Sequence, residues 1–240
     1  MTQEVIRKIN PNAVIKQGAI TYAQVPSSGT YLDRAKTYDS VEGFDDKLEK
    51  SFNEYGVYWD DMRIAGTSFL NGATAPSVSQ YQGSIYLPAY AAAATIDQAF
   101  ATVQFPHGWK IGTNFRPHIH WSPSVGGGVY DNQGVCWKID YSIAPRPGTF
   151  IAPVTMSGVD TWTTGSDGLV QYGHRRVRFM DSNGSTEIGV SGLTISSMIL
   201  LRLYRDNAHT ADTFTQPAHF LEVDFHYQID KPGSREELTK

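Results

Sequence analysis

The stretch Arg116-Pro117-His118-Ile119-His120-Trp121 alternates between polar and apolar side chains, and so does Glu222-Val223-Asp224-Phe225-His226-Tyr227 near the end of the chain. Successive side chains of a β-strand point to opposite faces of the sheet, so both stretches predict half-buried strands. In the second strand we expect Leu221 on the apolar face and Phe220 on the polar face. Three histidines and two carboxylates therefore lie on polar faces, and strand pairing decides whether those faces meet.

The rest of the chain from Tyr55 onward also has the composition of strands separated by turns. Aromatic and β-branched residues alternate with Gly, Pro, Asn and Asp, and about eight stretches fit strands. They cover residues 56–64, 83–87, 98–105, 115–121, 135–143, 169–180, 195–204 and 219–229. Strands without intervening helices favour an all-β, jelly-roll-like two-sheet β-sandwich over residues 55–240.

Residues 1–54 have little hydrophobic pattern and predict an extended N-terminal arm. Within this arm, Phe44, Leu48 and Phe52 recur at a spacing of four, which predicts a short amphipathic helix near 44–52. Such a short helix is marginal in water by itself. We therefore expect these three side chains to contact the sandwich or a neighbouring subunit.

Composition excludes several classes of function. The formal net charge is −4, so no global positive field attracts nucleic acid or anionic lipid. The chain contains no apolar run of about 18 residues and no apolar signal segment, so we expect neither a membrane protein nor a secreted one. Cys136 is the single cysteine, which excludes an intrachain disulfide.

Sequence signatures of catalysis are missing as well. There is no Gly-x-Ser-x-Gly elbow, no P-loop and no dinucleotide-binding glycine pattern. Cys136 lies in an alternating stretch and is expected to be a small strand residue, not a nucleophile. These features give no sign of a nucleophile or of a nucleotide-binding site, and we expect no cofactor.

One constellation could bind a metal ion. His118 and His120 lie on one face of a strand, and His226 and Asp224 share a face of another; together they could bind Zn, Mn, Fe or Ni. The set resembles that of a cupin, but no acidic residue follows His120 before Asp131. The alternative is that these groups form cross-strand hydrogen bonds and ion pairs.

Two long loops, residues 66–81 and 153–168, are rich in Gly, Ser and Thr, and such loops often contact other molecules. Trp162 lies in the second loop between threonines and is a candidate interface anchor. The alternative is that it folds back over the edge of its own sheet. Tyr130 is a second candidate contact residue.

Four blocks resemble, in the same order, a family of tailed-bacteriophage virion structural proteins. They are residues 57–63 (VYWDDMR), 104–113 (QFPHGWKIGT), 116–121 (RPHIHW), and 225–230 (FHYQID) with 233–237 (GSREE). The resemblance extends over residues 55–240 and leaves the arm outside. It implies a non-enzymatic building block of the virion, made in the cytoplasm of a host bacterium.

This resemblance leaves two virion roles open. The first is a capsid-associated cement or decoration protein, in which the arm and loops bridge subunits of the major capsid protein. We expect the protein to form a homo-oligomer, with a trimer favoured because three-fold symmetry suits both capsid three-fold positions and fibre or knob appendages. The second is a tail, collar or head-fibre component that binds a host-surface glycan through Trp162 and Tyr130. A cupin-like metal enzyme is the third hypothesis.

Overall fold

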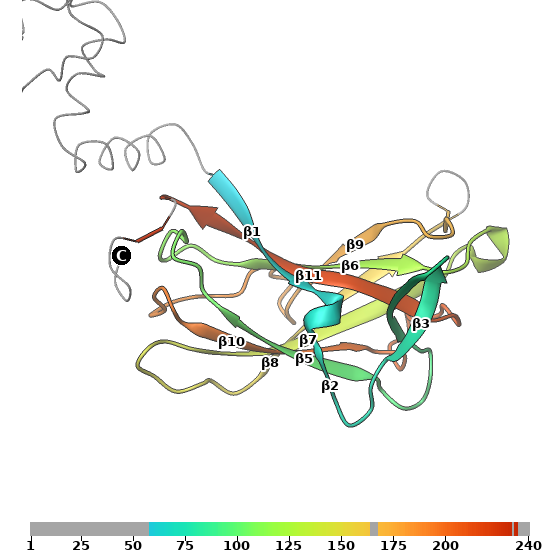
Figure 1. Cartoon of the computed structure of the whole chain (residues 1–240), viewed down its shortest axis with the longest axis horizontal. Helices are drawn as coiled ribbons and strands as arrows, with labels where there is room; N and C mark the ends of the chain where they lie inside the picture. Colours follow the sequence, from blue (N-terminus) through green and yellow to red (C-terminus); the bar gives the residue numbers. More distant parts are fainter. Residues whose placement is uncertain (1–57, 164–167, 232, 235–240) are drawn as a thin grey trace, which may run out of the picture. The chain divides into compact units, whose positions relative to one another are not determined.

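The computed structural model describes residues 58–163, 168–231 and 233–234. Two antiparallel sheets stack into a β-sandwich, which confirms the predicted fold class (Figure 1). The described residues contain no α-helix, only the 3-10 turns η2 (Gly66–Ser68) and η3 (Gly128–Tyr130), and no helix among them could span a membrane. The predicted arm, residues 1–54, and its helix near 44–52 lie outside the described residues.

Each sheet is built from strands that are distant in the sequence. The first contains β3 (Ser77–Gln82), β4 (Ile85–Tyr90), β11 (Ala218–Ile229), β6 (Arg116–Pro123) and β9 (Arg175–Arg178) in this order, while β1 (Tyr58–Ala65) pairs with β11. The second contains β2 (Leu70–Asn71), β5 (Gln98–Gln104), β10 (Met198–Arg205), β7 (Gly134–Ala144) and β8 (Val154–Thr161) in this order.

The connections between these strands are those of a jelly roll. From β4 onward each strand lies in the opposite sheet from the one before it, except that β7 and β8 form a hairpin. The resulting four-stranded halves are β4-β11-β6-β9 and β5-β10-β7-β8. This arrangement is the double-sheet jelly roll, to which β1, β2 and β3 are added.

The structure has eleven strands in its described part, and the sequence predicted about eight. Strands β2, β3 and β8 were missed, and the stretch predicted over 169–180 contains only the short β9. Strand β8 contains Gly158, a residue type that weakens strand propensity. A glycine is required here, because a Cβ atom at this position would lie 2.5 Å from the carbonyl oxygen of Arg178.

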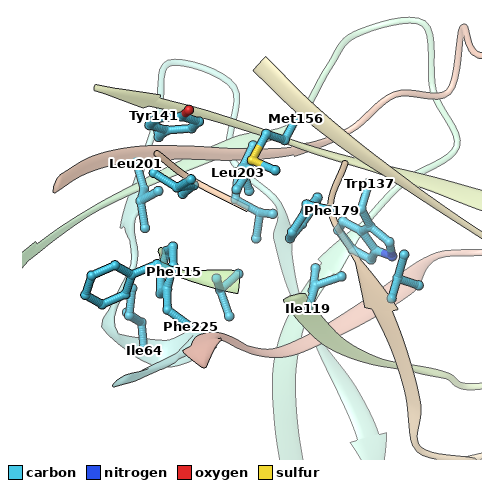
Figure 2. Packing of buried hydrophobic residues seen from close by; sticks show 14 of the residues in the cluster. Ile64, Phe115, Ile119, Trp137, Tyr141, Met156, Phe179, Leu201, Leu203 and Phe225 are labelled. Atoms are coloured by element: carbon cyan, nitrogen blue, oxygen red, sulfur yellow. The ribbon is translucent and has the colours of Figure 1, made fainter. Parts of the chain in front are cut away.

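Aromatic and aliphatic side chains from both sheets fill the space between them. Ile119 and Phe225 come from the first sheet, and Trp137, Leu201 and Leu203 come from the second (Figure 2). All five are almost completely buried. Strand alternation places them there, since every second residue of each strand faces the opposite sheet.

The predicted faces of β11 need one correction. Val223 and Phe225 face the core as expected, but Phe220 is also fully buried in the core, and Leu221 is only half-buried. The pairing of β11 with β6 shifts between Phe220 and Glu222, which marks a β-bulge at Leu221. A bulge inserts one extra residue and so reverses the alternation on one side of it.

Candidate functional site

The polar faces of β6 and β11 meet on the outer surface of the first sheet. Asp224 lies directly opposite His118, and Glu222 lies opposite His120. Strand β1 places Asp61 beside His226 on the other side of β11. All of the predicted metal-ligand candidates therefore lie in one patch, which we call the outer-face cluster. Its members are His118, His120, Glu222, Asp224 and His226.

Contacts within the outer-face cluster are short. His118 Nε2 lies 2.5 Å from Asp224 Oδ1, and His120 Nε2 lies 3.3 Å from Asp224 Oδ2. The imidazoles of His118 and His226 meet edge to face with their ring centres 4.4 Å apart. His226 Nε2 also lies 3.1 Å from Asp61 Oδ1. Asp224 is thus the carboxylate around which two of the three histidines gather.

A further histidine belongs to this neighbourhood and was missed in the sequence. His174, just before β9, stacks on His120 with ring centres 4.7 Å apart, and the two rings approach to 2.5 Å between His120 Nδ1 and His174 Nε2. No local pattern connects the two residues, because only the pairing of β9 with β6 brings them together.

The centre of the cluster is shielded from water. His118 and Asp224 are each only 3% exposed. Burial lowers the pKa of His120, with Asp224 acting in the opposite direction and the neighbouring His118 and His174 adding to the decrease. A half-buried imidazole in this setting favours its neutral form, which is the form that binds metal ions.

Arginine side chains surround the cluster. Arg63 forms a two-pronged ion pair with Glu222 at 2.7 Å, and Arg116 pairs with Glu187 at 2.7 Å while its guanidinium covers the Trp59 ring. Hydrogen bonds from Asn114 and Arg116 lower the pKa of Glu187. The outer-face cluster therefore contains both a group of potential metal ligands and cross-strand ion pairs. Both hypotheses from the sequence concern this one site.

A depression of about 260 Å³ opens beside the cluster. His118 and His226 line it together with Trp59, Arg176 and Arg178. The space between the sheets, in contrast, is packed with aromatic side chains. β-Barrel folds hold small ligands in such interiors. The outer-face cluster lies on the other side of the sheet from this interior, so it differs in position from the ligand sites found inside β-barrels.

The prediction that Trp162 is an interface anchor is wrong, because this side chain is 1% exposed. It follows β8 directly and folds back over the end of the sandwich, the alternative considered above. Its indole N–H donates a 2.6 Å hydrogen bond to the carbonyl oxygen of Tyr130, and its ring packs edge to face on Phe214. The threonines around Trp162 in the sequence gave no indication of its contacts with Tyr130 and Phe214.

The remaining predicted residues have different outcomes. Tyr130 is half-buried against Phe214, and its role as a contact residue stays a prediction. Phe44, Leu48 and Phe52 lie outside the described residues. Cys136 is buried in β7, and burial raises the pKa of its thiol to about 12. A thiol with such a pKa is protonated at neutral pH and is a poor nucleophile.

The sequence blocks quoted above come together around the C-terminal half of β11. Blocks 57–63 and 116–121 supply β1 and β6, which flank β11 on its two sides. In the block 104–113, Trp109 bridges to Ile229, and the Lys110 N–H donates to the Gln228 carbonyl oxygen at 2.7 Å. His107 Nδ1 lies 2.7 Å from Ser234 Oγ in the last block.

No model of a known protein family matches the chain, and the search of curated proteins found no match. Two of the solved structures that align with the chain show how weak the similarity is. The insecticidal delta-endotoxin Cry8Ea1 from Bacillus thuringiensis aligns with a TM-score of 0.39 and 10% identity, over 71% of this chain and 24% of that one. The structure of infectious bursal disease virus Gx strain aligns with 0.32 and 12%, over 74% and 34%.

This chain thus spans a quarter to a third of the length of the two proteins. Similarity this weak carries no argument about function.

Proposed function

We propose that this protein is a non-enzymatic structural component of a tailed-phage virion, namely a capsid-associated cement or decoration protein. The observation that carries the proposal is the spatial gathering of the four sequence blocks. They are separated in the chain, but three of them lie beside the half of β11 that the fourth block supplies. If the four blocks resembled the virion family only by chance, there would be no reason for them to lie together in the fold. If the chain shares the fold of that family, such a grouping is expected.

The architecture supports a building block over a catalyst. Aromatic and aliphatic side chains fill the interior of the jelly roll, and the buried Cys136 is poorly suited to catalysis. A fold by itself does not determine function. For this reason the role needs a test that assumes no mechanism.

Antibody–gold labelling of intact particles, viewed by electron microscopy, tests the proposal. We expect label spread over the head, because a cement protein covers the capsid lattice. Label confined to the tail, neck or sparse fibres would contradict the cement role and support the tail, collar or head-fibre alternative. Particles that carry no label, although the antibody recognises the purified chain, would rule out a virion component.

We further propose that the chain assembles as a homo-oligomer, with a trimer favoured. Two large apolar side chains, Val78 and Tyr86, are exposed on the same face of the β3–β4 hairpin and line one depression. Exposed apolar groups that lie together mark interaction surfaces. Light scattering of the full chain at micromolar concentration should give three times the chain mass of 26.6 kDa. A mass of one chain would refute assembly, and another multiple would refute the trimer.

A further inference from the structure

We propose that the outer-face cluster binds one divalent transition-metal ion through His118, Asp224 and His226. The potential ligand atoms of these three side chains all lie within 4.8 Å of one another. Zinc binds imidazole nitrogen and carboxylate oxygen at about 2.0–2.2 Å, so small side-chain rotations bring all three atoms onto one ion. The proposal is independent of the virion role, because it concerns the chain alone.

The buried carboxylate of Asp224 is the strongest argument for a cation. The residue is 3% exposed, and the His118 ring contacts its Oδ1, with Nε2 at 2.5 Å. No amide, hydroxyl, guanidinium or ammonium group of the described residues donates a hydrogen bond to this oxygen. Buried charges in proteins are paired or bind metal ions. A cation between the imidazoles would neutralise the carboxylate and accept lone pairs from both rings.

Arginine side chains lie near Asp224, but in the described structure its ion-pair partners are His118 and His120. Arg176 and Arg178 line the depression beside the cluster without an ion pair to Asp224. Arg63 lies beside Asp224 in the sheet, but its guanidinium donates hydrogen bonds to both oxygens of Glu222. The alternative explanation is a protonated His118 paired with Asp224, which requires no metal. Direct measurement of metal binding separates the two explanations.

The surroundings have further properties of a metal site. Asp61 contacts the His226 ring at 3.1 Å, and a carboxylate commonly orients a metal-binding histidine in this way. The ligands come from β6 and β11, two inner strands of the sheet, which hold them rigidly. The depression lined by His118 and His226 provides access for an ion from solvent.

The donor set indicates the class of ion. Two imidazoles and one carboxylate suit Zn²⁺ and neighbouring transition metals, whereas Mg²⁺ and Ca²⁺ prefer oxygen ligands alone. Three protein ligands leave room for a fourth, which His120 or water can supply. His120 Nε2 lies 3.3 Å from the second oxygen of Asp224, so it is close enough to take part.

Isothermal titration of the full-length, EDTA-treated chain with Zn²⁺ tests the proposal. We expect one ion per chain, and at least about tenfold weaker binding in Asp224→Asn and in His226→Gln, as when metal-site partners are lost. His219→Gln is the matched control. His219 lies on the same face of β11 and is as buried as Asp224, but it contacts Ser79 and not the cluster. Its binding should equal that of the unchanged chain.

Three results would overturn the proposal. They are a wild-type chain that binds no zinc, binding that persists unchanged in both variants, and equal loss in the His219→Gln control. If Asp224→Asn fails to fold by circular dichroism, two readouts still decide. One is His226→Gln, whose side chain is 36% exposed and can be replaced with little disturbance. The other is Co²⁺ absorption of the wild-type chain, where the spectrum of the free aqueous ion would refute the site.

Discussion

Replacement of Arg205 by methionine is expected to lower the free energy of unfolding by about 3–5 kcal/mol, the usual cost of breaking a buried ion pair. Arg205 ends β10, and its guanidinium binds both oxygens of Asp212 at 2.6 and 2.9 Å. Both side chains are 1% exposed. The variant would leave the Asp212 carboxylate buried, with the Cys136 N–H as its remaining hydrogen-bond donor among the described residues.

Arg205 also organises the backbone at this end of the sandwich. Its guanidinium donates to the carbonyl oxygens of Tyr90, Phe214 and Gln216, which belong to or flank other strands. Methionine fills part of the volume but donates no hydrogen bond. Three buried or half-buried carbonyl groups would therefore lose a partner as well, which places the effect among the largest available in this chain.

Urea unfolding followed by tryptophan fluorescence measures this loss. Arg202→Met is the matched control, because Arg202 lies on the same strand and pairs with Asp140 at 2.8 Å, but its side chain is 33% exposed. We expect the control to lose only about 0–1 kcal/mol, as exposed ion pairs do. Equal losses in the two variants would contradict the role assigned to burial.

Trp162→Ala is expected to cost about 3–5 kcal/mol of unfolding free energy, as large-to-small replacements of buried aromatic residues do. The indole packs on Phe214 and Trp121, and its N–H satisfies the Tyr130 carbonyl oxygen. The guanidinium of Arg175 lies 5.2 Å from its ring centre. Alanine would leave a cavity at the end of the core and an unpaired carbonyl group.

The same urea titration tests this prediction, with Trp59→Ala as the control. Trp59 lies on β1 and is 40% exposed, so its loss should cost less than about 1 kcal/mol, mainly its contact with Arg116. A Trp162→Ala variant that keeps its unfolding midpoint but changes its mass in light scattering would restore the interface interpretation. A lower free energy of unfolding, with no change in the mass measured by light scattering, would confirm that Trp162 is a core residue.

Strands with a clear alternation were the most predictable part of the fold. β6, β7 and β11 could be identified from sequence because a period of two is a local property that survives in any sheet. β8 was missed because Gly158 is required by a contact that the local sequence does not reveal. The Gly158 backbone passes close to the backbone of Arg178, which is distant in the chain. The bulge at Leu221 escaped for a similar reason, since it depends on the pairing with β6.

The candidate site was likewise predictable only in those features that depend on local sequence. The polar faces of β6 and β11 follow from their residue order alone, because alternation assigns each side chain to a face. Their meeting does not, since it requires β6 and β11 to be neighbours in a jelly roll and their register to set Asp224 opposite His118. Register and strand order also add His174 from β9 and bury Trp162 behind β8. These contacts join residues far apart in the chain, so only packing of the whole sandwich determines them.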